Sequence, residues 1–271
     1  MRGAAVVTGA ARGLGLEIAR ALAPRGYALT VADVDAEAAA EAASELGDRA
    51  SAAALDVRDA DACERLATEV AERAGRLDVW VNNAGILRTA PSWAHSEEER
   101  RAMFEVNTYG LINGTLAALE LMRPAGRGHV INVISLAGLA APPGETVYAA
   151  TKHAALAFSI GTLYDLREAG IDDVHIGCVC PDGLWTAMLH DKVDDPYAAP
   201  SWSGVMLKPA DVAAEAVKLL DRPRPLITLP PWRGAFARVF ATFPSIGARV
   251  APRMMAQARR KQAAWAREHP R

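Results

Sequence analysis

The sequence predicts one α/β domain, built on a doubly wound sheet of seven parallel strands and followed by a basic amphipathic helical extension. Short apolar and β-branched runs alternate with longer alanine-rich segments of helical spacing, which is typical of right-handed β-α-β units. A glycine-rich loop directly follows the first run, where such folds turn from strand to helix. With 271 residues, 51% of them hydrophobic, the chain can bury one large core, which excludes a disordered protein.

The predicted strands are short apolar runs bounded by glycine, proline or polar residues. They span residues 4–7, 28–32, 50–56, 79–82, 129–134, 174–179 and 226–229. Between these runs, hydrophobic residues recur at helical spacing and predict the helices. The helices span residues 13–24, 36–46, 60–74, 97–122 with a break near Asn107, 147–168 and 210–220.

Two regions interrupt this alternation. Residues 182–207 follow the carboxyl end of the sixth strand, where parallel sheets bind ligands, and we expect them to form a lid. An ordinary surface loop is the alternative. The second region begins after residue 230, and its residues 233–271 contain nine Lys or Arg and one acid, a net charge of +8.

The extension has hydrophobic residues at roughly helical spacing between Phe236 and Met254, with arginines beside them. This pattern predicts a basic amphipathic helix. Packing within the chain or across subunits is the favoured interpretation, and peripheral contact with an anionic membrane is the alternative.

Composition restricts the partners and the compartment. The net charge of −2 leaves no general field for nucleic acid, so none is expected as a partner. The cysteines Cys63, Cys178 and Cys180 lack the paired spacing of a zinc site, so we expect no metal, and unpaired thiols favour the cytoplasm. We also expect no signal segment, and no apolar stretch approaches the roughly 18 residues of a membrane span.

The loop after the first strand reads TGAARGLG and leads directly into an amphipathic helix. Its glycines would let the backbone approach a pyrophosphate, and the helix presents free N–H groups and its positive dipole end to that anion. The spacing GxxxGxG differs from the commoner GxGxxG, but its position between strand and helix supports dinucleotide binding. We expect contacts from Gly9, Arg12, Gly13, Leu14 and Gly15.

Asp33, 18 residues beyond Gly15, ends the second strand. Its carboxylate can accept hydrogen bonds from the adenosine ribose and would repel a 2'-phosphate, which favours NAD over NADP. Arg12 could pair with such a phosphate, but the acid would touch the ribose directly. Asp56 and Val57, after the third strand, are expected to contact the adenine, with a simple turn as the alternative.

Five motifs occur together: the glycine loop, Asn82-Asn83-Ala84-Gly85, Asn107, Ser135 and Tyr148-x-x-x-Lys152. In their order and spacing, over about residues 3–230, the chain resembles the short-chain dehydrogenase/reductase family in its compact form. We expect residues 82–85 to shape the floor of the cofactor cleft, with a tight turn that binds no ligand as the alternative. The resemblance implies that Lys152 binds the nicotinamide ribose. It also implies that Asn107 bends its helix and positions a water that relays protons to the lysine.

Tyr148 and Lys152 lie four residues apart on a predicted helix and therefore share a face. A lysine ammonium beside a phenol stabilises the phenolate and lowers its pKa from about 10 toward working pH. We expect Tyr148 to act as general base in alcohol oxidation and as general acid in the reverse direction. Ser135, at the end of the fifth strand, is expected to donate to the substrate oxygen.

One position departs from the family pattern. After the sixth strand, the family's Pro-Gly-x-x-x-Thr reads Pro181-Asp182-Gly183-Leu184-Trp185-Thr186. Pro181 and Gly183 are expected beside the cofactor, and the resemblance implies that Thr186 contacts the nicotinamide carboxamide. An aspartate in place of glycine restricts the backbone and adds a carboxylate. The shape of this loop is therefore not predicted, whereas the predicted reaction is unchanged.

Hydrophobic residues make the expected lid apolar, which favours a lipophilic alcohol or ketone over a sugar or a charged acid. The lid residues are Trp185, Met188, Leu189, Trp202, Val205 and Met206, and the further walls are Leu87, Ala137 and Val147. Packing of these side chains on the lid's own core is the alternative.

We therefore expect an NAD-dependent oxidoreductase that interconverts a lipophilic secondary alcohol and its ketone. Residues 1–232 would form the dinucleotide-binding and catalytic domain and residues 233–271 the extension. An NADPH-linked reductase of 3-oxoacyl or other ketones is the alternative enzyme, which Arg12 would permit and Asp33 opposes. A non-catalytic dinucleotide-binding redox sensor is the alternative from another class, disfavoured by the complete catalytic set. The resemblance also implies a homo-oligomer, a dimer or a tetramer.

Overall fold

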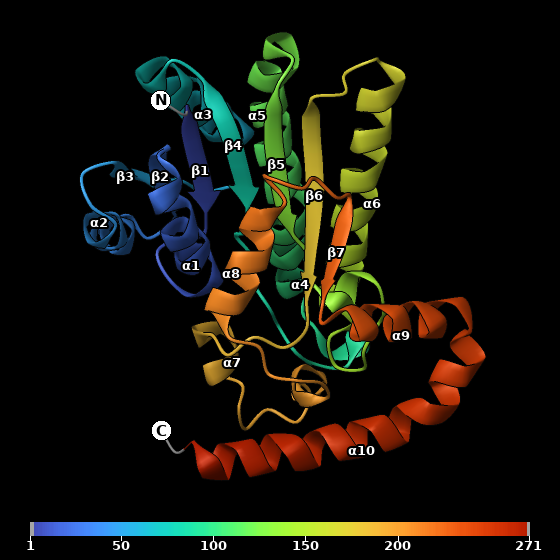
Figure 1. Ribbon diagram of the computed structural model, residues 1–271. Helices are drawn as coiled ribbons and strands as arrows, with labels where there is room; N and C mark the ends of the chain where they lie inside the picture. The colour runs from blue at the N-terminus through green and yellow to red at the C-terminus, as the bar shows by residue number, and fades with distance from the viewer. Residues whose placement is uncertain (1–2, 270–271) are drawn as a thin grey trace.

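The structure, a computed structural model, describes residues 3–269. Within them, seven parallel strands form one sheet in the order β3-β2-β1-β4-β5-β6-β7 (Figure 1). The strands are β1 (Ala4–Thr8), β2 (Ala28–Asp33), β3 (Ala50–Ala54), β4 (Leu77–Asn82), β5 (Gly128–Val133), β6 (Val174–Pro181) and β7 (Leu226–Leu229). The strand order turns back between β1 and β4, so their carboxyl ends flank the crevice where doubly wound sheets bind ligands. The predicted fold is confirmed.

Helices cover both faces of the sheet (Figure 1). One layer contains α1 (Gly13–Leu22), α2 (Ala36–Glu45) and α8 (Pro209–Lys218), and the other contains α3 (Ala60–Ala74), α5 (Gly110–Ala125) and α6 (Thr146–Glu168). Side chains of β1 alternate between the layers, with Ala5 and Val7 in the first core and Ala4 and Val6 in the second. A strand that is buried on both faces has a continuous run of apolar residues. This run is why β1 could be predicted from the sequence.

Some predicted boundaries move by a few residues. The helix predicted over residues 13–24 ends at Leu22, and Pro24 lies in a 3₁₀ turn, η1 (Ala23–Arg25), because proline cannot supply the next helical hydrogen bond. The strand predicted over residues 50–56 ends at Ala54. Neither change moves the carboxyl edge of the sheet.

The segment predicted as one helix over residues 97–122 is divided in three. α4 (Glu97–Phe104) leads into a turn of π-helix, η3 (Glu105–Tyr109), and α5 then continues to Ala125. A π turn inserts an extra residue into the helical ladder and is frequent at functional sites. The turn contains Asn107, where the sequence predicted the break.

The expected lid over residues 182–207 contains a short helix, α7 (Ala187–His190), and a 3₁₀ turn, η5 (Ala199–Trp202). The extension forms α9 (Pro231–Thr242) and α10 (Pro244–Glu268), which project from the body and return beneath the lid (Figure 1). Gln262 of α10 donates from Nε2 to the carbonyls of Lys192 at 3.1 Å and Asp195 at 2.8 Å. The end of α10 is therefore hydrogen bonded to the lid. The domain boundary expected at residue 232 remains a prediction.

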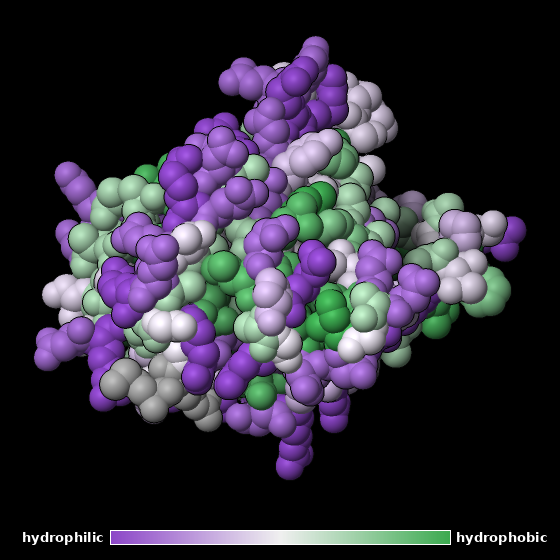
Figure 2. All heavy atoms as spheres, turned by 90° about the horizontal axis from the view of Figure 1, so that it is seen from above, coloured by the Kyte–Doolittle hydropathy of each residue, from purple (hydrophilic) through white to green (hydrophobic). Residues whose placement is uncertain are grey.

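Figure 2 shows hydrophobic atoms on the projecting edge of the molecule at the right, where Figure 1 places the turn between α9 and α10. The exposed apolar side chains of this segment are Trp232, Phe236, Val239, Phe243 and Ile246. Within the described part of the chain, no helix combines the length and the apolar character needed to cross a bilayer.

Candidate active site

A continuous cavity of about 1040 Å³ runs along the carboxyl edge of the sheet. It begins at the glycine loop after β1, passes the ends of β2 to β6 and reaches α9 and α10. Ligand sites commonly measure roughly 300–1000 Å³, so this cavity can hold more than one bound molecule.

The glycine loop forms one end of the cavity, which Gly9, Arg12, Gly13 and Leu14 line. Gly9 has a φ of +61°, and a Cβ there would lie 2.7 Å from Cα of Ala84. The predicted contact from Gly15 is corrected, because Gly15 lies behind the loop and not in the wall. A Cβ on Gly15 would come within 2.2 Å of the Gly9 carbonyl oxygen, so this glycine allows α1 to pack closely on the loop.

Asp33 faces the same end of the cavity and is 8% exposed. Its Oδ2 accepts a hydrogen bond from the Ala11 N–H at 3.1 Å, which ties the glycine loop to the end of β2. Arg12 is exposed, and within residues 3–269 it forms no ion pair with Asp33. The carboxylate therefore faces the region expected to hold the ribose.

Asp56 and Val57 also line the cavity. Arg58 holds the Asp56 carboxylate, with Nη2 at 2.6 Å from Oδ2, and this hydrogen bond lowers the pKa of the acid. An adenine contact through this carboxylate would have to share it with Arg58. Val57 is buried and presents an apolar surface to the cavity.

Of residues 82–85, which we expected to shape the floor of the cofactor cleft, Asn83, Ala84 and Gly85 line the cavity and Asn82 does not. Asn83 donates from Nδ2 to the Gly9 carbonyl at 2.8 Å and therefore fixes the glycine loop. Asn82 points away into a buried network, where its Nδ2 donates to Asn132 Oδ1 at 2.9 Å.

Asn107 is 1% exposed and lies behind the cavity wall. Its Oδ1 accepts from the Ile86 N–H at 2.8 Å, and its Nδ2 donates to the Ile86 carbonyl at 2.9 Å and to Thr151 Oγ1 at 3.1 Å. The expected water-positioning role cannot use the side-chain N–H groups, because both are engaged. The amide instead holds the loop after β4 against α6.

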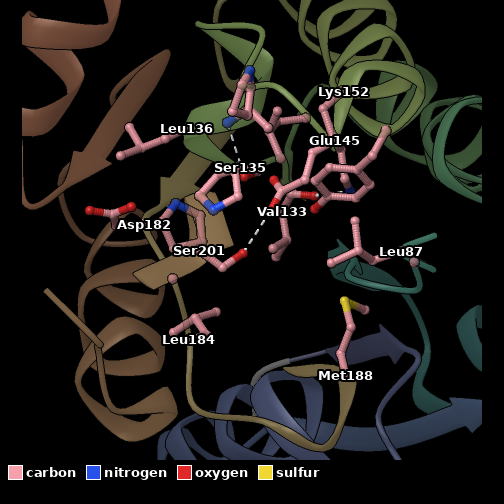
Figure 3. A pocket seen from close by; sticks show the side chains of 18 of the residues that line it. Leu87, Val133, Ser135, Leu136, Glu145, Lys152, Asp182, Leu184, Met188 and Ser201 are labelled. Atoms are coloured by element: carbon pink, nitrogen blue, oxygen red, sulfur yellow. Dashed lines mark hydrogen bonds between the residues drawn. The ribbon is translucent and has the colours of Figure 1, made fainter. Parts of the chain in front are cut away.

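Ser135, Tyr148 and Lys152 meet in the middle of the cavity wall. Tyr148 and Lys152 share a face of α6, with Lys152 Nζ 5.7 Å from the centre of the Tyr148 ring. Lys152 Nζ donates to the Val133 carbonyl at 3.2 Å. Ser135 Oγ accepts from the Ala137 N–H at 3.0 Å, and the Ser135 side chain is also hydrogen bonded to Tyr148. Figure 3 shows Ser135 and Lys152 from close by.

The electrostatic prediction for Tyr148 is wrong for the structure as it stands. Burial is the largest effect and raises the pKa of the Tyr148 phenol well above its usual value, and the nearby Glu145 carboxyl raises it further. Ser135 opposes both by hydrogen bonding. Burial also lowers the pKa of Lys152 to about 8. Desolvation is therefore the largest influence on the pKa of both side chains.

Glu145 is a site residue that the sequence analysis missed. It is 5% exposed, lines the cavity and accepts a hydrogen bond at Oε1 from Ser201 Oγ at 2.9 Å. Burial raises its pKa to about 7. Its position three residues before Tyr148 was the available signal, but an acid at the start of a helix is commonly a surface residue.

Asp182 forms a buried ion pair with Arg233 of α9. Arg233 Nε lies 2.7 Å from Asp182 Oδ2, and the two side chains are 13% and 6% exposed. Arg233 also donates from Nη2 to Ser203 Oγ at 2.8 Å. Among the described residues, no residue other than glycine has a positive φ, so aspartate fits this loop without glycine's backbone freedom.

The remaining loop residues Pro181, Gly183 and Thr186 line the cavity. A Cβ on Gly13 would lie 3.7 Å from Thr186, so Thr186 faces the glycine loop across the cleft. Thr186 therefore lies close to the loop expected to bind the pyrophosphate.

The substrate walls differ in part from the prediction. Leu87, Ala137, Met188 and Leu189 line the cavity. The other predicted wall residues, Trp185, Trp202, Val147, Val205 and Met206, lie outside its lining. Trp185 packs on Trp265 of α10 with ring centres 5.1 Å apart, and Trp202 is 4% exposed inside the lid. Indole rings bury more apolar surface there than they would in an open wall.

The extension supplies the wall that these residues do not. Apolar residues of α9 and α10 line the far end of the cavity: Phe236, Phe240, Met254 and Met255. Sequence reasoning could not place them, because their contact with the site depends on the return of α10. Within the described residues, no three His, Cys, Asp or Glu side chains gather as a metal site would require.

Residues 3–196 match the sequence profile of the family described as short chain dehydrogenase. The chain therefore belongs to the short-chain dehydrogenase/reductase family. It is 31% identical over 232 residues to a 3-oxoacyl-(acyl-carrier-protein) reductase of Chlamydia muridarum (strain MoPn / Nigg), covering 83% of this chain and 92% of the relative. It is 32% identical over 224 residues to cyclopentanol dehydrogenase of Comamonas sp. (strain NCIMB 9872), covering 80% and 88%.

A crystal structure of a short-chain dehydrogenase/reductase from Burkholderia phymatum in complex with NAD is also similar. It matches with a TM-score of 0.83 and 26% identity, covering 90% of this chain and 95% of that one. The likeness therefore covers the sheet and both helical layers.

Proposed function

We propose that the protein is an NAD-dependent oxidoreductase that interconverts a lipophilic secondary alcohol and its ketone. The supporting observation is one cavity that joins the glycine loop to Ser135, Tyr148 and Lys152. The residues present fit a dinucleotide, because Gly9 leaves no room for a Cβ beside Ala84 and the amino end of α1 faces the loop.

Asp33 supports NAD rather than NADP, since its buried carboxylate would meet a 2'-phosphate as a like charge. The solved relative from Burkholderia phymatum was crystallised with NAD. The alternative, an NADPH-linked 3-oxoacyl reductase, is supported by the relative of that activity and by Arg12 in the loop. Titration with both cofactors separates the two, because tighter binding of NADPH would contradict our proposal.

Bound NAD⁺ would supply the hydride acceptor and a positive charge beside the phenol. In alcohol oxidation, Ser135 donates to the substrate oxygen and Tyr148 takes the hydroxyl proton as the carbinol carbon gives up its hydride. Tyr148 returns that proton in ketone reduction. Because burial raises the pKa of Tyr148, its role as base depends on positive charge close to the ring, of which protonated Lys152 supplies part.

A panel of secondary alcohols and ketones, followed by the absorbance of NADH, tests this function. We expect turnover of apolar substrates by the wild-type protein and a loss of about a hundredfold or more in Tyr148→Phe, which cannot transfer the proton. Activity retained in Tyr148→Phe would contradict the mechanism. Binding of NAD without turnover of any substrate would favour the redox sensor.

We further propose that α9 and the start of α10 make peripheral contact with an anionic membrane. Trp232, Val239 and Phe243 are at least half exposed, and arginines stand beside them. Such a surface suits a bilayer interface with anionic headgroups. The far end of α10 packs on the lid, which supports the packing interpretation for that half of the extension.

A homo-oligomer and a cytoplasmic location are also part of the proposal. Leu116 of α5 and Tyr164 of α6 are exposed apolar side chains that a second copy could cover. Light scattering after gel filtration would test the number of subunits. The three cysteines are buried free thiols, and burial raises the pKa of each to about 12, which suits a reducing compartment.

A further inference from the structure

Glu145 occupies the cavity wall next to the reacting groups. It is the N-cap residue of α6, three residues before Tyr148, and both side chains line the same cavity. The carboxyl group of Glu145 faces Ser201 of the lid, to which it is hydrogen bonded (Figure 3). Figure 3 shows the Glu145 side chain near Ser135 and Lys152, and the carboxyl group of Glu145 raises the pKa of the Tyr148 phenol.

The hydrogen bonding of this buried carboxyl group is incomplete. Ser201 serves Oε1, whereas no donor among the described residues serves Oε2. Oε2 is not among the fully buried polar atoms without a partner in residues 3–269, so it is accessible from the cavity that Glu145 lines. An oxygen that faces a ligand cavity can obtain its partner from the ligand.

The neighbouring charged groups do not supply the missing partner. Asp182 is paired with Arg233, and Asp195 accepts hydrogen bonds from Thr89 Oγ1 and from the Tyr197 N–H. Lys192 is the nearby cation, and it acts on Glu145 electrostatically without a hydrogen bond to it. The opposite side of the cavity is apolar, with Leu87 and Met188 (Figure 3).

We infer that Glu145 is a specificity-determining residue that binds a second oxygen of the substrate, so that the preferred substrates are lipophilic 1,2- or 1,3-diols and the corresponding hydroxy ketones. This inference rests on the proposed function. One hydroxyl group binds at Ser135 and gives its proton to Tyr148 as the carbon that carries it gives up a hydride. The second hydroxyl group, one or two carbons away, binds to Glu145 Oε2 and is unchanged by the reaction.

The protonation of Glu145 suits this role. Burial raises its pKa to about 7, with Asp182 and Asp195 acting in the same direction and Ser201 and Lys192 opposing it. A neutral carboxyl group can both donate to and accept from a hydroxyl group. It also avoids a second negative charge beside the Tyr148 phenolate that forms in the reaction.

Matched pairs of substrates test the inference: cyclohexanol against 1,2-cyclohexanediol, and 2-butanol against 2,3-butanediol. For the wild-type enzyme we expect kcat/KM to be at least about tenfold higher for each diol, as one additional hydrogen bond predicts. Glu145→Met and Glu145→Ala should bring this ratio close to one, mainly by raising KM for the diol. Glu145→Gln keeps a donor and an acceptor and should retain most of the preference.

Thermal melts of each variant show whether it is folded, and the alanine variant serves if the methionine variant does not fold. Equal kcat/KM for both members of each pair in the wild-type enzyme would overturn the inference and leave the proposed function intact. A diol preference that survives in Glu145→Met and Glu145→Ala would do the same. Failure of the wild-type enzyme to oxidise any of the four alcohols would count against the proposed function and the inference together.

Discussion

Glu145 shows how burial of one side chain links protonation to stability. Burial raises its pKa from 4.5 to about 7, so the folded protein keeps a proton that the unfolded chain has lost in this pH range. The folded state therefore loses stability as the pH rises from about 4.5 to about 7, and the loss persists above that range.

Glu145→Gln should remove this dependence, because glutamine keeps the Ser201 hydrogen bond and does not ionise. We expect the variant to match the wild type near pH 4.5 and to be more stable by about 2 to 3 kcal/mol at pH 8. Urea unfolding of both proteins at the two pH values measures the difference. A difference that does not change with pH would contradict the buried, protonated state.

Single residues of the site differ in how well the sequence reveals them. Ser135, Tyr148 and Lys152 could be named in advance, because strand ends and one-turn spacing depend on local structure alone. Glu145 and Arg233 could not, since their roles arise from burial and from a partner distant in sequence. Arg233 lies 51 residues beyond Asp182, and nothing local to either residue indicates the ion pair.

At the level of elements, this ion pair joins the loop after β6 to α9. Arg233→Met would leave Asp182 buried without its counterion, which should cost roughly 3–5 kcal/mol of folding stability. Replacing Asp182 by glycine in the same chain, as in Asp182→Gly/Arg233→Met, should recover most of that loss. Denaturant unfolding of the single and double variants tests the expectation.

The matching single variant Asp182→Gly is the control, because it leaves the partly exposed guanidinium of Arg233 free to reach water. It should cost less than Arg233→Met. If both single variants and the double variant have the stability of the wild type, the pair does not hold α9 to the loop.

Elements with a strong local pattern were predicted well, and those that depend on tertiary contacts were not. The strands and the break at Asn107 follow from apolar runs and from a polar residue in a helical stretch. The sequence predicted the position of the lid in the chain but not the packing of its side chains. Trp185 packs on α10, and Trp202 is buried inside the lid. The choice between facing a cavity and facing a neighbouring helix requires the position of that helix.

For the whole molecule, the separation of apolar and basic surface on α9 and α10 predicts binding to anionic lipid. We expect the protein to sediment with vesicles of phosphatidylcholine and phosphatidylglycerol, and much less with phosphatidylcholine alone. Val239→Asp/Phe243→Asp should reduce the bound fraction about tenfold or more, since it removes apolar contacts and adds negative charge. Both side chains are at least half exposed, so folding should not suffer.

The control is Trp93→Asp, which removes an exposed aromatic residue outside the extension and should leave sedimentation unchanged. Equal sedimentation of the wild type and of Val239→Asp/Phe243→Asp would contradict the membrane proposal. A change in subunit number in the α9 variant, seen by light scattering, would instead assign this surface to a second copy of the chain.

The return of α10 beneath the lid has a consequence for biosynthesis. Met254, Met255 and Ala258 complete the far wall of the cavity, and Gln262 fastens the lid. A nascent chain on the ribosome can assemble the sheet and the glycine loop long before these residues emerge. The growing polypeptide can therefore enclose a substrate only after its sheet is complete.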